Sequence, residues 1–168
     1  LLEGTDVVLV GRRLVDAVPD LQVVLPLHPN PNVRGPFERA FAGASRVLLT
    51  EPLGYRDLLK LMHRSTLILS DSGGLQEEAP SMGRPILILR ERTERPEVVE
   101  VGAGVLVGTD PNLIVKEALS ILCDPVVYKR MVTAPNPFGD GRAGDRISEI
   151  LESALLDEVD MPAMAMVL

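Results

Sequence analysis

The chain has 168 residues, a formal net charge of -7 and an isoelectric point near 4.9. This length suits one domain with a substantial core, and a share of 24% charged residues argues against a disordered chain. Proteins that bind duplex nucleic acid usually carry a basic face, so the acidic balance disfavours that class of partner.

A membrane, a disulfide framework and a structural zinc site are all disfavoured. No apolar run reaches the length that a bilayer-spanning helix needs. The one cysteine, Cys123, suits a reducing cytoplasm, and we expect it to be buried as a small apolar residue. The two histidines, His28 and His63, are too few for a structural zinc site with a distant cysteine.

Short β-rich runs alternate with helical patterns along the chain. VVLV at 7–10 is interpreted as the first strand, and the turn-rich segment HPNPNVRGP at 28–36 as a loop. PILILR at 85–90 is apolar on both faces, as buried strands of parallel sheets are. The predicted strands cover 7–10, 21–27, 46–50, 66–70, 85–90 and 104–108, and the predicted helices cover 11–18, 37–44, 55–65, 75–83, 94–102, 112–123, 125–132 and 142–159.

This alternation predicts an α/β fold, a Rossmann-like parallel sheet with helices on both faces. Ligands of such sheets bind beyond the carboxyl ends of the strands. We expect one domain over residues 1–157 and a frayed tail over 158–168.

The segment SDSGGLQEEAP at 70–80 lies at such a strand end. A helix that begins at two glycines, Gly73 and Gly74, offers free backbone N–H groups to a phosphate, and Ser72 adds a hydroxyl donor or caps the helix. Glu78 lies one turn after Gly74 and can accept hydrogen bonds from sugar hydroxyls. The alternative is a plain helix cap, with Asp71 or Ser72 as the capping residue and solvated glutamates.

Two further strand ends carry candidate binding residues. Three arginines, Arg90, Arg92 and Arg95, follow the strand at 85–90, where one of them could grip a diphosphate with two hydrogen bonds. The alternative is surface pairing with nearby glutamates, which we expect for at least one arginine. At the end of the strand at 21–27, His28 is either a polar site group or a buried histidine.

Four segments together resemble the non-hydrolysing bacterial UDP-N-acetylglucosamine 2-epimerases: PLHPNPNVRGP, EPLGYRDLLKLM, the long run from LILSDSGG through TERPE to LVGTD, and NPFGDGRAGDRI. The resemblance covers roughly residues 20–150. It implies one half of a B-type glycosyltransferase (GT-B) fold, the carboxy-terminal UDP-binding domain, with the amino-terminal domain absent.

The resemblance also implies roles for individual residues. Ser72, Gly73 and Gly74 would hold the diphosphate of UDP, and Glu78 the ribose hydroxyls. Arg95 would contact the phosphates or the sugar side of the cleft. The segment EPLGYRDLL would hold uracil through backbone groups near Leu53 and through Leu58.

The reaction that the resemblance implies inverts C2 of the sugar, through elimination of UDP and its re-addition, without metal or nicotinamide. The family's catalytic carboxylates lie in the amino-terminal domain, as do most contacts of its common homodimer. A histidine–arginine–arginine–glutamate motif that follows the first strand in the family is missing here, where VVLV runs into GRRLVDAVPD. We therefore expect a shortened connection at that point, and this chain alone to be inactive. No catalytic residue is assigned, although His28 is a candidate.

Two other functions share this fold and nucleotide site. One is a nucleotide-sugar binding module without turnover, and the other is a GT-B glycosyltransferase domain. The TERPE run at 93–97 argues against the glycosyltransferase.

Overall fold

The computed structural model describes residues 4–27 and 29–159. Within these residues helices and strands alternate, which confirms the predicted α/β class. The elements are α1 (Gly4–Ala17), β1 (Val23–Pro26), α2 (Pro31–Ala40), β2 (Val47–Thr50), α3 (Tyr55–Arg64), β3 (Ile68–Ser70), α4 (Gly73–Ser81), β4 (Ile86–Ile88), α5 (Pro96–Glu100), β5 (Gly104–Leu106), α6 (Pro111–Cys123), α7 (Pro125–Val132) and α8 (Ala143–Val159).

The strand predicted at 7–10 is wrong, because these residues belong to the continuous helix α1. The β-branched run favours a strand by intrinsic preference. Burial against the rest of the fold favours the helix, since Val10 and Leu14 are buried at helical spacing while Leu9 is 45% exposed. The shortened connection expected after a first strand therefore has no counterpart in the described residues.

The loop predicted at 28–36 is also wrong in its larger part, because α2 begins at Pro31. Proline suits the first position of a helix, where its missing N–H would have no acceptor. A second proline, Pro36, lies inside α2 and cannot donate a helical hydrogen bond. Arg34 on this helix forms ion pairs with Glu38 at 2.7 Å and with Glu51 at 2.5 Å, so its charge is used within the fold.

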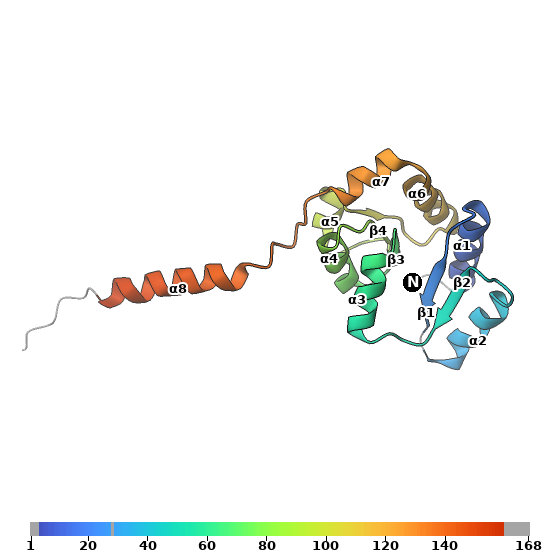
Figure 1. Cartoon of the computed structure of the whole chain (residues 1–168), viewed down its shortest axis with the longest axis horizontal. Coiled ribbons are helices and arrows are strands. Elements are labelled where there is room, and N and C mark those ends of the chain that lie inside the picture. Colours follow the sequence, from blue (N-terminus) through green and yellow to red (C-terminus); the bar gives the residue numbers. More distant parts are fainter. Residues whose placement is uncertain (1–3, 28, 160–168) are drawn as a thin grey trace, which may run out of the picture. The chain divides into compact units, whose positions relative to one another are not determined.

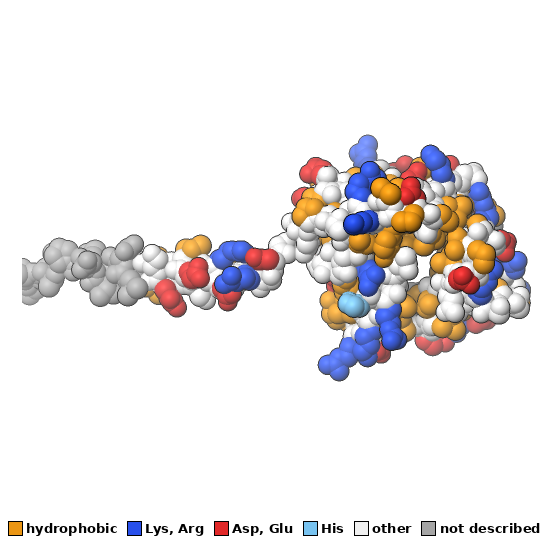
Figure 2. Space-filling view, turned by 45° about the horizontal axis from the view of Figure 1, so that its top comes forward, with side chains coloured by type: hydrophobic (Ala, Val, Ile, Leu, Met, Phe, Trp, Pro, Cys, Tyr) orange, Lys and Arg blue, Asp and Glu red, His pale blue; other side chains and the backbone are white. Residues whose placement is uncertain are grey.

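The strands form two parallel sheets, where the sequence predicts one. β1 pairs with β2, and β4 lies between β3 and β5. Because residues 7–10 are helical, they supply no strand, and among the described residues β1 and β3 each have a strand neighbour on one edge only. A largely apolar cavity of about 520 Å³ is lined by side chains of both strands, including Leu25 and Leu69. Figure 2 shows hydrophobic side chains gathered around a hollow in this part of the molecule.

Helices cover both faces of the three-stranded sheet, as predicted. Leu87 of β4 packs in one buried cluster with Ile114 of α6 and with side chains of α1. Ile86 points to the other face, where a Cβ placed on Gly104 would lie 3.0 Å from Ile86 Cγ2 and 3.1 Å from Val98 Cγ2 of α5. Figure 1 shows α4 and α5 on one side of β4 and α6 on the other. The fully buried β4 therefore forms the centre of the core.

Several helix ends follow directly from the sequence. Asp110 caps α6 by accepting a hydrogen bond from the N–H of Asn112, and Pro111 follows as the first helical residue. Gly83 has a φ of 61° just after α4, which is the left-handed conformation that glycine adopts at little cost. The sequence predicts a helix end at this glycine, and α4 ends two residues earlier, at Ser81.

The described residues fall into two compact units, one up to Pro137 and one from Phe138 onward. The single domain predicted over 1–157 stays a prediction. Cys123 is exposed at the end of α6, so its predicted burial is wrong. Among the described residues, no helix combines the length and the apolar character needed to cross a membrane.

Candidate functional site at the start of α4

The turn between β3 and α4 presents a serine that its own helix does not use. Ser72 occupies the N-cap position in an extended conformation, but its side chain makes no capping hydrogen bond. Its backbone N–H donates to the Ser70 hydroxyl oxygen at 3.0 Å. Ser72 is exposed, so its hydroxyl can reach a ligand from solvent.

The first turn of α4 also presents backbone donors. The N–H of Gln76 donates to the Ser72 carbonyl at 3.3 Å and is the first amide to enter the helical pattern. The amides of Gly73, Gly74 and Leu75 precede it and have no acceptor within the helix. These donors and the positive end of the helix dipole make this turn suited to an anion.

The two glycines leave this backbone uncovered, although the fold itself does not require them. Neither Gly73 nor Gly74 has a positive φ. A Cβ added to Gly73 would meet no atom within 4 Å, and one added to Gly74 would meet only the Ser72 hydroxyl oxygen, at 3.9 Å. Internal packing and backbone strain therefore do not explain the glycines, whereas close approach of a ligand to the backbone would.

Glu78 lies one turn further along α4 and is half-buried. The hydroxyl of Tyr55, the first residue of α3, donates to Glu78 Oε1 at 2.8 Å. This hydrogen bond raises the pKa of Tyr55, and burial and the carboxylate charge add to the same direction. The contact brings the start of α3 against the flank of α4.

Arg95 also reaches α4, but its charge is already paired. Its Nε forms an ion pair with Glu77, and its Nη1 donates to the Glu94 carbonyl at 3.1 Å. The hydrogen bond with Glu77 is the main cause that raises the pKa of Arg95. Arg95 thus lies beside the predicted site and is held there by a carboxylate of the same helix.

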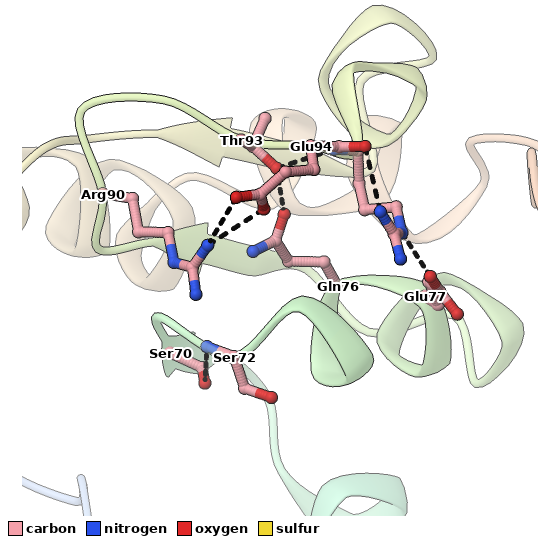
Figure 3. A network of polar contacts seen from close by, with 8 residues as sticks. Ser70, Ser72, Gln76, Glu77, Arg90, Thr93 and Glu94 are labelled. Carbon is pink, nitrogen blue, oxygen red and sulfur yellow. Dashed lines mark hydrogen bonds and ion pairs between the residues drawn. The ribbon is translucent and has the colours of Figure 1, made fainter.

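A polar network joins α4 to the segment after β4. The Thr93 hydroxyl donates to Gln76 Oε1, and Arg90 pairs with Glu94 at 2.9 Å. Figure 3 shows this network arching from the end of β4 over the first turns of α4. The surface pairing expected for at least one arginine is confirmed by Arg90. Gln76 is fully buried, and among the described residues its Nε2 has no hydrogen-bond partner.

Sequence reasoning misses two polar residues of this site, Tyr55 and Gln76. Tyr55 lies between Leu53 and Leu58 in a segment that the family resemblance selects, so its position was an available signal. Gln76 carries a weaker signal, because it lies three residues before the buried Ala79 and so on the same helical face.

The remaining predicted residues are distributed as follows. Leu53 in the loop before α3 and Leu58 on α3 are both half-buried, and the Tyr55–Glu78 contact brings their segment to α4. His28 lies outside the described residues. The cavity between β1 and β3 is lined by no residue of α4, so it is distinct from the candidate site.

The sequence matches the model of one protein family over residues 5–152, the UDP-N-acetylglucosamine 2-epimerases. UDP-N-acetylglucosamine 2-epimerase of Bacillus subtilis is 50% identical over 140 residues, which cover 83% of this chain and 37% of that protein. The enzyme of the same name from Escherichia coli K12 is 48% identical over 134 residues, which cover 80% and 36%. The chain thus spans little more than a third of the length of these relatives.

Solved structures agree with the sequence match. A putative UDP-N-acetylglucosamine 2-epimerase from Listeria monocytogenes superposes with a TM-score of 0.87 and 39% identity, covering 98% of this chain and 44% of that one. The Neisseria meningitidis UDP-GlcNAc 2-epimerase, solved with UDP-GlcNAc bound, superposes with a TM-score of 0.84 and 41% identity, covering 89% of this chain and 41% of that one. Because these neighbours have a GT-B-like fold, the chain corresponds to one part of that fold. The family model covers most of the sequence, and the chain belongs to the UDP-N-acetylglucosamine 2-epimerase family.

Proposed function

We propose that this chain is the UDP-binding part of an enzyme that interconverts UDP-N-acetylglucosamine and UDP-N-acetylmannosamine. The observation that carries the proposal is the start of α4, where Ser72 and two glycines present donors that the fold leaves unused. Family membership supports the same conclusion, since one relative was solved with UDP-GlcNAc bound.

In this proposal the diphosphate lies at the first turn of α4. Backbone N–H groups of Gly73 and Gly74 and the hydroxyl of Ser72 donate to its oxygens, and the helix dipole adds to the attraction. Arg95 approaches from the start of α5. Arg95 pairs with Glu77 in the structure. To contact the phosphate, its guanidinium must therefore either leave Glu77 or bind the Glu77 carboxylate and the phosphate at the same time.

The nucleoside lies along the flank of α4. Glu78 accepts hydrogen bonds from the ribose hydroxyls, and the segment that carries Leu53 and Leu58 holds uracil. Support comes from the hydrogen bond between Tyr55 and Glu78, which brings the start of α3 to this flank.

The reaction removes UDP from the sugar and adds it back with C2 inverted. The part of this chain is to hold the leaving UDP with donors that are already oriented, which favours the departing charge. Proton transfer at C2 is assigned to the remainder of the longer enzyme, and His28 stays a candidate for a supporting role. This chemistry is redox-neutral and needs no nicotinamide.

We place this enzyme in the cytoplasm, in agreement with a single free cysteine. We further propose that the longer enzyme forms a homodimer through its amino-terminal domain.

Calorimetric titration of this chain with UDP tests the proposal. We expect saturable binding, and we expect Glu78→Gln to weaken UDP more than 2′,3′-dideoxy-UDP, because only UDP has ribose hydroxyls to donate. Uridine, which lacks the diphosphate, is the control ligand and should bind much more weakly. Equal affinity for uridine and UDP would reject the diphosphate site. The longer enzyme, with its amino-terminal domain, should then convert UDP-N-acetylglucosamine to UDP-N-acetylmannosamine. Proton NMR can monitor the formation of this product.

A further inference from the structure

Two neighbouring glutamates on α4 have partners of different kinds. Glu77 is paired with the guanidinium of Arg95, so its charge is neutralised. Glu78 accepts from the neutral hydroxyl of Tyr55 at 2.8 Å, so this partner brings no opposite charge to the carboxylate. Among the described residues this hydroxyl is the hydrogen-bond partner of Glu78, which leaves the second oxygen open to a ligand.

Tyr55 makes this contact although the residue is 64% exposed. Burial of the ring therefore does not explain its position at the start of α3. Tyr55 and Glu78 are 23 positions apart in the sequence, so the bond is a tertiary contact between two helices. Leu53 and Leu58 flank it in sequence, and the same hydroxyl thus links the proposed uracil segment to the proposed ribose acceptor.

We propose that Tyr55 is a positioning residue, whose hydroxyl orients the Glu78 carboxylate so that it accepts hydrogen bonds from both vicinal hydroxyls of a ribose. This inference rests on the proposed function of the site and adds a determinant of its specificity for ribonucleotides.

The geometry supplies the reason. An ionised carboxylate has about four acceptor positions on its two oxygens, and Tyr55 uses one of them on Oε1. A pair of vicinal hydroxyls needs two further positions at a fixed orientation. A free glutamate side chain would lose its rotamer freedom when the ligand binds, whereas here that freedom is already restricted by Tyr55. The raised pKa of Tyr55 agrees with a hydroxyl that stays protonated and keeps donating.

The test compares Tyr55→Phe with Tyr128→Phe, a matched control at the chain's other tyrosine, which lies on α7. Each change removes one hydroxyl. Both variants are titrated with UDP and with 2′,3′-dideoxy-UDP, and thermal unfolding checks that each is folded.

We expect Tyr55→Phe to weaken the affinity for UDP about fivefold, which corresponds to the loss of one ordinary hydrogen bond. The affinity for 2′,3′-dideoxy-UDP should stay unchanged. Tyr128→Phe should change neither affinity. Combining Tyr55→Phe with Glu78→Gln should cost no more than Glu78→Gln alone, because both act through one carboxylate.

Two results would overturn the inference: an unchanged UDP affinity of Tyr55→Phe, or an equal loss for both nucleotides. Neither result touches the proposed function as long as Glu78→Gln still discriminates between the two ligands. Failure of the unchanged chain to bind UDP, or of Glu78→Gln to discriminate, would instead reject the ribose site itself and the role of Tyr55 with it.

Discussion

We predict that a single methyl group added at Gly74 impairs UDP binding at the start of α4 and leaves the fold intact. A Cβ at this position would lie 3.9 Å from the Ser72 hydroxyl oxygen, an ordinary contact distance, and would meet no other atom within 4 Å. The protein can therefore accept Gly74→Ala without a clash. The methyl group would, however, lie beside the hydroxyl that we assign to the diphosphate.

The two expected effects have opposite signs. Alanine restricts the unfolded chain more than glycine, so Gly74→Ala should stabilise the fold by about 0.4–1 kcal/mol. A displaced phosphate would lose a hydrogen bond between a charged group and the backbone, worth about 1.5–3 kcal/mol. This loss corresponds to a UDP affinity that is about 10- to 150-fold weaker.

Calorimetry with UDP and thermal unfolding measure the two effects in one set of variants. The matched control is Gly144→Ala, because Gly144 is likewise the second residue of its helix, α8, and a Cβ added to it would meet no atom within 4 Å. The control should bind UDP like the unchanged chain. Should Gly74→Ala also bind UDP with unchanged affinity, the start of α4 would not be the diphosphate site.

Three further predictions concern individual polar groups. Ser72→Ala should weaken UDP binding by about 1–2 kcal/mol in calorimetry with little change in thermal stability. Asp110→Ala is the comparison, because it removes a formed cap and should cost about 1 kcal/mol of stability. A large stability loss for Ser72→Ala would instead identify Ser72 as a structural cap. Arg95→Lys should weaken UDP if a bidentate grip forms on binding, and full retention of affinity would leave Arg95 as a structural cation. Asp140 has a pKa below its ordinary value, mainly because of its hydrogen bond with Arg146, so its stabilising effect is present near neutral pH and is lost as the pH falls through that lowered pKa. Circular dichroism should therefore show helix loss in acid. Asp140→Asn should be less stable than the unchanged chain at neutral pH and should lose less helix on acidification.

Much of the fold could be predicted because several segments carry consistent local signals. The run at 85–90 is apolar throughout and becomes the buried strand β4. Asp110 and Pro111 mark the start of α6 by their chemistry, and Gly83 marks the end of α4. In these places local preference and burial agree.

The errors occur where local preference and tertiary burial disagree. The valines of 7–10 favour a strand by themselves, yet Val10 and Leu14 bury one face of a helix against α6 and its neighbours. The prolines of 28–36 are typical of a loop, yet Pro31 also suits a helix start. A reading of single segments cannot weigh contacts that form only after folding.

The candidate site shows the same division. The position of Ser72, Gly73 and Gly74 at a strand end follows from the order of elements along the chain. The hydrogen bond between Tyr55 and Glu78 does not, because it joins residues of two different helices, α3 and α4, that only the folded chain brings together. Sequence therefore indicates which helix end could hold an anion, and the structure adds which neighbour orients the carboxylate.

The division of the strands into two sheets has a consequence for the order in which the chain opens. No backbone ladder joins β1 to β3 among the described residues, so their amides share no cooperative unit through hydrogen bonding. Deuterium should enter the half-buried β1 and β2 sooner than the fully buried β4. The loop at 51–54 connects β2 to α3, whereas α4 packs on β3 and β4. A nucleotide that contacts both this loop and α4 would therefore link the two sheets. Its binding should slow deuterium exchange in β1 and β2 and leave exchange in β4 unchanged.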